Sequence, residues 1–207
     1  MALVTIKPNE IDLAIAHAIA RKARPVPEEV ARAVTWGADE KLLLALAAVG
    51  WLVTRTEPKS LRRAGNHLLL VTATASLLPH VLKLIFDQRR PDRETVLGHL
   101  HGVPLSGKRN DAFPSGHALH MGALASAAGA WPRPSRATAR GFAVALSLTR
   151  VFILAHWASD VVIGFLIGVV LERLLRLWTS YPKMRRLDAR SREPLRRGTF
   201  RGTEPAA

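Results

Sequence analysis

The sequence predicts an all-α fold: an integral membrane helical bundle of about five transmembrane helices, with an amphipathic interfacial helix at the N-terminus. Three observations lead to this fold class. Five stretches approach the roughly 20 mostly apolar residues that a helix needs to cross a hydrocarbon core. Basic residues cluster in the gaps between these stretches. All five tryptophans lie near the ends of the stretches, where indole rings favour the headgroup layer.

The first expected element is an amphipathic helix over residues 9–24 that lies on the membrane surface. Asn9 is a suitable N-cap, and Pro25 ends the helix. A soluble helix packed against a loop is the alternative for this segment. A second short helix is expected over residues 27–34. The apolar face of the first helix is formed by Ile11, Ile15, Ala18 and Ile19.

The transmembrane core is expected over residues 36–178. Small residues at helical spacing, Gly164 with Gly168 and Gly122 with Ser126, would let its helices approach closely in lipid. The five expected spans are residues 36–54, 66–86, 118–131, 141–157 and 160–178.

Residues 1–182 are expected to form one membrane domain, in which residues 1–35 supply the interfacial helices. The Arg-rich residues 183–207 lack apolar periodicity, so they are expected to form a basic, disordered cytoplasmic tail.

The net positive charge of the chain limits the kinds of binding partner that it can have. The chain has 30 Lys and Arg residues against 16 Asp and Glu residues, a formal net charge of +14. Such a balance favours nucleic acid, an anionic membrane surface or a phosphorylated substrate. Aromatic residues are only 6% of the chain, so nucleic acid is not expected as a partner. The absence of cysteine excludes disulfides and thiolate chemistry.

The basic gaps also predict an orientation. The positive-inside rule assigns residues 55–65, residues 132–140 and the tail to the cytoplasm. The order of the helices then sends the loop 87–117 and the junction 157–160 to the opposite face. We therefore expect a multi-pass protein of the cell (inner or plasma) membrane, with these two segments on the extracytoplasmic side. No removable signal peptide is expected.

The junction before the last span carries a candidate nucleophile. His156 and Asp160 are four residues apart and would share one helical face, so that the carboxylate holds one imidazole nitrogen. A neutral histidine oriented in this way can attack phosphorus and form a phosphohistidine that water then hydrolyses. His156 with Asp160 is therefore predicted as a nucleophilic pair.

Three cations are candidates for binding phosphate. No metal site is recognisable in the sequence, so side-chain cations and backbone N–H groups are expected to stabilise the transferred phosphoryl group. Lys83, Arg90 and Arg150 are those cations. The seven-residue spacing of Lys83 and Arg90 is about two helical turns, which would place both on one face near a helix end that Pro91 terminates.

The run Pro114-Ser115-Gly116-His117 sets a turn just before an apolar stretch. Ser115 and the Gly116 N–H would present donors at a helix N-terminus, which attracts anions. His117 would then be placed to protonate the leaving oxygen as a general acid.

Together these segments resemble the type 2 phosphatidic acid phosphatase family, whose signature blocks are Lys-x6-Arg-Pro, Pro-Ser-Gly-His and Ser-Arg-x5-His-x3-Asp. The resemblance covers Lys83 to Asp160. Thr149 stands where the family has Ser, which preserves a hydroxyl, and five spans are expected where six are common in the family. The family implies phosphate binding by the cations, assistance by Ser115 and Gly116, and catalysis by the residues His117, His156 and Asp160.

The predicted function is therefore that of an integral membrane phosphatase, without metal or cofactor. It would hydrolyse a phosphomonoester or pyrophosphate on a lipid through a phosphohistidine. The family implies polyprenyl phosphate or pyrophosphate, glycerophospholipid phosphates and phosphorylated saccharolipids as substrates, of which we favour the first two. The expected partners are this lipid and the bilayer, and the sequence leaves the oligomeric state open. The alternatives are a vanadate-dependent haloperoxidase-like enzyme and a non-catalytic membrane protein that binds lipid headgroups.

Other polar residues are expected to play structural parts. His17 and His67 are predicted on the surface, and His80 is predicted to line a polar bundle interior near Lys83. Glu172 is expected to pair locally with the neighbouring residues Arg173 and Arg176 near the inner end of the last helix.

Overall fold

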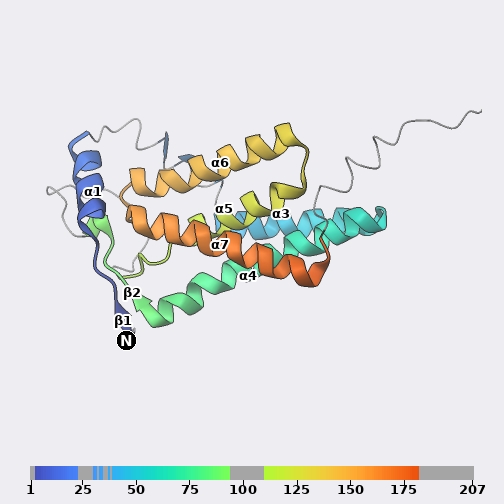
Figure 1. The fold of residues 1–207 in the computed structure, drawn as a ribbon, viewed down its shortest axis with the longest axis horizontal. Helices are drawn as coiled ribbons and strands as arrows, with labels where there is room; N and C mark the ends of the chain where they lie inside the picture. Colours follow the sequence, from blue (N-terminus) through green and yellow to red (C-terminus); the bar gives the residue numbers. More distant parts are fainter. Residues whose placement is uncertain are drawn as a thin grey trace, which may run out of the picture.

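The computed structural model describes residues 3–22, 30–31, 33–34, 37, 39–93 and 110–181, and within them the chain is almost wholly helical (Figure 1). Five helices form the bundle, and each coincides with one of the five expected spans, so the predicted all-α fold is confirmed. These helices are α3 (Glu40–Val53), α4 (Lys59–Ile85), α5 (Gly116–Ala127), α6 (Arg133–Phe152) and α7 (Ala158–Thr179).

Shorter elements connect the bundle. A separate helix, α1, precedes it, and two short strands pair in parallel with Val4 opposite Phe86. The sequence did not predict this pair. It forms because the extended backbone after α4 leaves polar groups that the N-terminal strand satisfies. The elements are α1 (Glu10–Lys22), β1 (Val4–Thr5), β2 (Phe86–Asp87), and the 3₁₀ turns η2 (Thr54–Thr56), η3 (Pro91–Arg93) and η5 (Ala128–Ala130).

Two helices are longer at their beginnings than the expected spans. α4 and α6 both continue through basic segments that were expected to be loops, and each starts directly after a proline, Pro58 or Pro132. Arg and Lys are good helix formers, so charge alone does not end a helix. α6 also ends at Phe152, which leaves His156 outside it.

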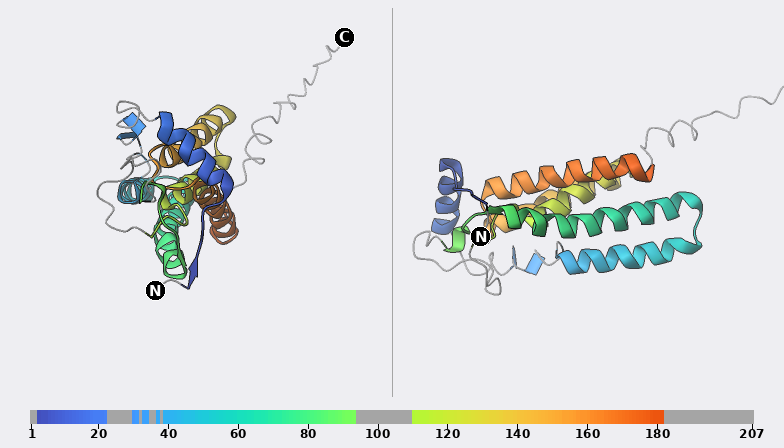
Figure 2. Two further views of the ribbon diagram at one scale, coloured as in Figure 1. Left: turned by 90° about the vertical axis from the view of Figure 1, so that its left-hand side faces the viewer. Right: turned by 90° about the horizontal axis from the view of Figure 1, so that it is seen from below.

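The bundle helices lie roughly along one axis, with consecutive helices antiparallel, and α1 lies across one end of them (Figures 1 and 2). α5 is the central helix, because eight of its 12 residues are buried. A helix that is apolar around its whole circumference belongs in such a position.

Glycines bring α5 and α7 together without intervening side chains. A Cβ on Gly168 would lie 1.9 Å from the carbonyl oxygen of Leu119, and one on Gly164 would lie 2.6 Å from that of Ser115. From the other side, a Cβ on Gly122 would lie 2.0 Å from the Phe165 carbonyl oxygen. The predicted close approach of helices at these three glycines is confirmed.

α1 packs against the bundle through its smallest side chains. Ala16 and Ala20 are buried against Leu154 and Trp157. Of the expected apolar face, Ile15 and Ile19 are partly buried against the bundle, but Ile11 is 70% exposed. Asn9 caps the helix as predicted, since its side chain accepts a hydrogen bond from the Asp12 N–H at 2.8 Å. An interfacial position for α1 stays a prediction.

The outward faces of the bundle are apolar. α3 has no buried residue and exposes Leu46, Val49 and Leu52. α6 and α7 similarly expose Phe142 and Leu166. Such a surface is costly in water. In the part of the chain that the structure describes, one helix, α4, has the length and composition to cross a membrane. The count of five spans therefore stays a prediction.

Not every tryptophan lies where the headgroup layer would be expected. Trp157 is buried, and its indole N–H donates to the Arg89 carbonyl at 2.8 Å, so this ring supports the fold instead of sitting among headgroups. The expected tail over 183–207, Trp36 and half of the expected helix over 27–34 lie outside the described residues.

The contact between α5 and α7 predicts a steep cost for enlarging it. Gly168→Ala should destabilise the protein by about 1–3 kcal/mol, because the added methyl group meets backbone that has no side chain to move. Thermal unfolding in detergent measures this. Gly141→Ala is the matched control, since a Cβ there meets nothing within 4 Å. Equal melting temperatures for the two variants would contradict the packing described.

Candidate active site

The three predicted sequence blocks meet at the end of the bundle that α1 covers. This end carries the C-termini of α4 and α6 and the N-termini of α5 and α7 (Figure 1). The positive charges of Lys83, Arg90 and Arg150 act on both His117 and His156. The structure therefore brings the predicted cations and both histidines together.

A helix C-cap fixes His156 relative to Arg150. The N–H of Ala155 donates to the Arg150 carbonyl at 3.1 Å, and that of Leu154 donates to the Val151 carbonyl at 3.0 Å. These two bonds form a Schellman motif, and the N–H of His156 adds a third bond to the Arg150 carbonyl at 3.2 Å. Backbone hydrogen bonds therefore fix the conformation of the five residues that separate Arg150 from His156.

The motif has a leucine where glycine is usual. Leu154 has a φ of 53°, in the left-handed region. For a residue with a Cβ this conformation costs about 1–2 kcal/mol. The side chain is buried against Trp157, and burial of a leucine contributes about 1.5–3 kcal/mol. Packing therefore offsets the strain that positions the following residues.

A backbone carbonyl sets the tautomer of His156. Its Nδ1 lies 2.6 Å from the Ala112 carbonyl oxygen, and a carbonyl only accepts, so Nδ1 carries the hydrogen. Nε2 is then the ring nitrogen with the lone pair. His156 is 3% exposed, and burial, followed by the positive charges of Arg90 and Arg150, holds its pKa well below the usual 6.5. The imidazole is therefore neutral at neutral pH.

Asp160 supports His156 differently from the prediction. The two residues do not share a helical face, because His156 lies in the α6–α7 connection. Asp160 Oδ2 is 3.9 Å from His156 Nδ1 and accepts a hydrogen bond from the Trp157 N–H at 3.0 Å. Thus the Ala112 carbonyl orients the ring, whereas Asp160 caps the start of α7 beside it.

Asp111 joins two of the cations, a contact that the sequence analysis did not predict. Its Oδ1 accepts from Arg90 Nε at 2.7 Å, and its Oδ2 lies 3.6 Å from Lys83 Nζ. Arg90 also donates to the Ala155 carbonyl at 3.3 Å. The predicted shared helical face is wrong, because α4 ends at Ile85 and Arg90 follows β2. The position of Asp111 in the sequence, between Arg90 and Arg150, was the one indication that it could pair with these cations.

The start of α5 carries the Pro-Ser-Gly-His block. Ser115 is its N-cap, fully buried, and its Oγ accepts from the Ala118 N–H at 3.5 Å. Its own N–H donates to the Asp160 carbonyl at 3.3 Å, which links the beginnings of α5 and α7. Gly116 is the first helical residue, and a Cβ there would make only ordinary contact with Pro79 at 3.5 Å. His117 is half-buried in the first turn.

Asp12 of α1 is a second residue that the sequence did not reveal. Its Oδ1 accepts from the Ser159 N–H at 2.9 Å, and its Oδ2 accepts from the Ser159 hydroxyl at 2.7 Å. α1 thereby holds the first turn of α7 beside Asp160. No local pattern could have indicated a partner 147 residues away.

Two predictions about other histidines are wrong. His80 is not in the bundle interior: its side chain is 66% exposed and lies 3.6 Å from Glu40. His67 is not on the surface: it is fully buried and bonds Glu172 at 3.0 Å. The sequence pattern gave both histidines the wrong environment, because side-chain packing and not hydropathy decides which side of α4 faces α7. Among the described residues, no group of three His, Cys, Asp or Glu side chains could hold a metal ion.

The structure is a helical bundle with two histidines and three cations grouped at one end, and a known family shares these features. Residues 64–184 match the sequence profile of the PAP2 superfamily, so the chain belongs to this superfamily. The predicted family resemblance is confirmed.

The chain is 35% identical over 106 residues to the lipid A 1-phosphatases of Rhizobium johnstonii and Rhizobium etli. That match covers 50% of this chain but only 43% and 45% of those proteins, so it spans less than half of their length.

Two solved structures share the fold. The transmembrane PAP2 type phosphatidylglycerolphosphate phosphatase of Bacillus subtilis superposes with a TM-score of 0.62 at 24% identity, over 85% of this chain and 88% of that one. Aquifex aeolicus LpxE superposes with a TM-score of 0.62 at 18% identity, over 83% of this chain and 98% of that one.

The contact between Asp12 and Ser159 should stabilise the catalytic end. Asp12→Ala leaves the partly buried Ser159 N–H without its acceptor, which should cost about 1–3 kcal/mol. Thermal unfolding in detergent measures the loss. Glu10→Ala, in the exposed first turn of α1, is the control and should melt like the parent protein. A parent-like melting temperature for Asp12→Ala would contradict the anchoring role.

The lowered pKa of His156 predicts acid sensitivity. Below pH 6.5 the unfolded chain protonates this histidine while the folded protein keeps it neutral, so the free energy of unfolding falls as pH falls. Above pH 6.5 both states are neutral, and the contribution is complete. The loss approaches about 1.4 kcal/mol per pH unit. Melting temperatures measured from about pH 8 to pH 5 should decline less for His156→Gln than for the parent, and parallel curves would contradict this assignment.

Proposed function

We propose that the protein is a multi-pass membrane lipid phosphatase that transfers a phosphoryl group to His156 and then to water, without a metal. One observation carries the proposal. The buried His156 ring donates Nδ1–H to the Ala112 carbonyl, which leaves a neutral Nε2 lone pair in the electrostatic field of three cations. A neutral, oriented imidazole among cations is the arrangement that nucleophilic attack on a phosphate dianion requires.

In the first step, His156 Nε2 attacks phosphorus as the bond to the lipid oxygen breaks. Lys83, Arg90 and Arg150 neutralise the equatorial oxygens, and His117, which the bound phosphate dianion keeps protonated, donates its proton to the departing oxygen. The phosphorylated ring is positively charged, and the Asp160 carboxylate, 3.9 Å from Nδ1, stabilises it.

In the second step, water attacks the phosphohistidine. His117, now neutral, accepts a proton from this water as the P–N bond breaks, and inorganic phosphate leaves. His156 returns to its starting state, and His117 regains its proton. The cycle needs one histidine as nucleophile and another as acid and then base, which matches the two histidines of this site.

The proposed substrate is a lipid whose headgroup ends in a phosphomonoester or pyrophosphate. Polyprenyl phosphates and glycerophospholipid phosphates fit this chemistry. The lipid A 1-phosphatase relatives add saccharolipid phosphates to the class. The exposed apolar side chains on α3, α6 and α7 support a position in the bilayer, where the lipid tail would also lie.

We also propose that the active site faces the extracytoplasmic side. The bundle end opposite the histidines is rich in arginine. By the positive-inside rule this end faces the cytoplasm. Its basic residues on α6 and α7 include Arg133, Arg136, Arg140, Arg173 and Arg176.

Substitution of the two histidines should separate their roles. His156→Ala should lower phosphate release from lipid phosphates by at least about 10⁴-fold, because the nucleophile is lost. His117→Ala should lower lipid turnover by about 10²–10⁴-fold. With p-nitrophenyl phosphate, whose leaving group departs without protonation, His117→Ala should instead give a burst of one nitrophenolate per enzyme. The second step then lacks its base, so base-stable, acid-labile phosphohistidine accumulates.

The control is His80→Ala, which removes an exposed histidine outside the site and should retain parent turnover. Unchanged lipid turnover in His156→Ala would refute the nucleophile. Slow turnover of both substrates in His117→Ala, with no burst, would refute its role as acid. Loss of parent activity with a chelator would contradict the metal-free reaction.

A further inference from the structure

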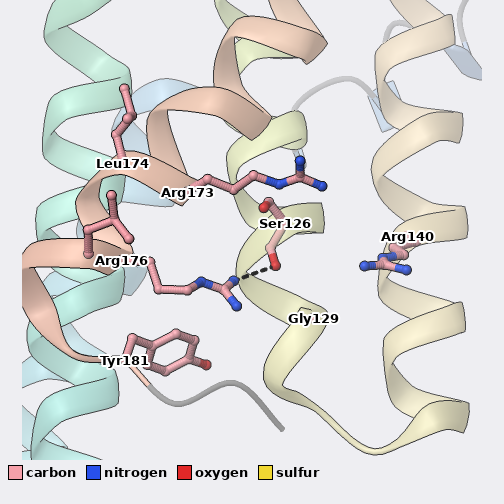
Figure 3. A pocket seen from close by; sticks show the side chains of 8 residues that line it. Ser126, Gly129, Arg140, Arg173, Leu174, Arg176 and Tyr181 are labelled. Carbon is pink, nitrogen blue, oxygen red and sulfur yellow. Dashed lines mark hydrogen bonds between the residues drawn. The ribbon is translucent and has the colours of Figure 1, made fainter. Parts of the chain in front are cut away.

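A polar cavity lies at the bundle end opposite the histidines. It has a volume of about 700 Å³ and opens between the ends of α5 and α7 and the middle of α6 (Figure 3). Arg173 and Arg176 project into it from α7, and Arg140 faces them from α6. Its polar lining is completed by Ser126, Gly129 and Tyr181.

The arginines converge although they repel one another. A Cβ on Gly129 would lie 3.6 Å from a terminal nitrogen of Arg140 and 3.9 Å from one of Arg176. Two guanidinium groups from different helices thus reach the same point. Because Gly129 has no side chain, that point stays accessible to a ligand.

One of the three charges is internally balanced. Arg176 Nε donates to Glu172 Oε1 at 2.7 Å, and Arg176 also donates to the Ser126 carbonyl at 2.8 Å. Glu172 is fully buried and is further held by His67 and by the Ser126 hydroxyl, which donates at 2.5 Å. The predicted local pairing of Glu172 is confirmed for Arg176, but the carboxylate lies inside the bundle instead of near the surface.

The other two charges have no such balance. No carboxylate of the described residues forms an ion pair with Arg140 or Arg173. Arg140 uses its Nε to donate to the Ala125 carbonyl at 3.3 Å, which fixes the side chain over the cavity. The cavity therefore carries an excess of positive charge on a partly fixed frame, which suits a phosphate group.

The walls of the cavity extend onto an apolar surface. Leu174 and Leu177 line it and are 57% and 74% exposed. Trp178, beside them on α7, is more exposed still. A cationic recess next to outward-facing apolar side chains matches an amphiphile with a phosphate headgroup and an acyl tail.

We propose that this cavity binds the phosphate group of an anionic lipid in the leaflet opposite the active site. A free phosphate ion presents the same chemistry, so the experiment includes both. The site is separate from the proposed catalytic one: Arg173 follows Asp160 on α7 by 13 residues, about 20 Å of helix. The lipid would hold the ends of α5, α6 and α7 together, the same three helices that carry His117, Arg150 and Asp160 at the other end.

The test is thermal unfolding of purified protein in detergent with added phosphatidylglycerol, phosphatidylcholine or inorganic phosphate. Phosphatidylglycerol is a phosphodiester, so a phosphomonoesterase does not consume it. At a hundredfold excess over its Kd it should raise the melting temperature by on the order of 5 °C. The double variant Arg140→Gln/Arg173→Gln should lose this rise. Arg176 is left intact because it pairs with a buried carboxylate.

The matched control is Arg133→Gln/Arg136→Gln, which removes two arginines of α6 that do not line the cavity and should keep the full rise. A rise with phosphatidylglycerol alone identifies a lipid ligand, and an equal rise with millimolar phosphate identifies the free ion. In both cases the cavity variant must lose the rise. Equal rises in both double variants, an equal rise with phosphatidylcholine, or no rise at all would overturn the proposal. Because the readout is stability, the result does not depend on whether the chain hydrolyses lipids.

Discussion

The structure depends on the contact between the backbones of α5 and α7. At Gly164 and Gly168 there is no space for even a methyl group, so the distance between these helices is set by main-chain atoms. The hydrogen bond from Ser115 N–H to the Asp160 carbonyl lies at the end of this contact. As a result, the two helix starts that carry the proposed acid and the supporting carboxylate have a fixed relative position before any ligand binds.

Much of this arrangement was predictable from the sequence, and the reasons differ from one element to another. The five bundle helices were predicted because long apolar stretches are visible in any window. The candidate site residues could be singled out because their types and spacings suit phosphoryl transfer, and the structure brings them to one end of the bundle. The contributions of Asp12, Asp111 and the Ala112 carbonyl were not predicted. They depend on contacts between distant segments, and a backbone carbonyl has no signature in a sequence at all.

The errors follow the same logic. His67 and His80 both lie on α4, and the helical pattern assigned each to the wrong environment. His67 is buried because it bonds Glu172 of α7, whose charge must be satisfied inside the bundle. A buried charge therefore organises polar residues that hydropathy would send to the surface. The same carboxylate fixes Arg176, so it also shapes the arginine-lined cavity.

The cap that ends α6 requires a fixed number of residues between Arg150 and His156. Three backbone bonds close the chain from Arg150 to His156, and two of them converge on a single carbonyl. Adding or removing one residue within this segment would separate the imidazole from the Ala112 carbonyl and remove the contact that determines which ring nitrogen carries the hydrogen. This segment therefore tolerates exchange of its apolar side chains more readily than any change in its length.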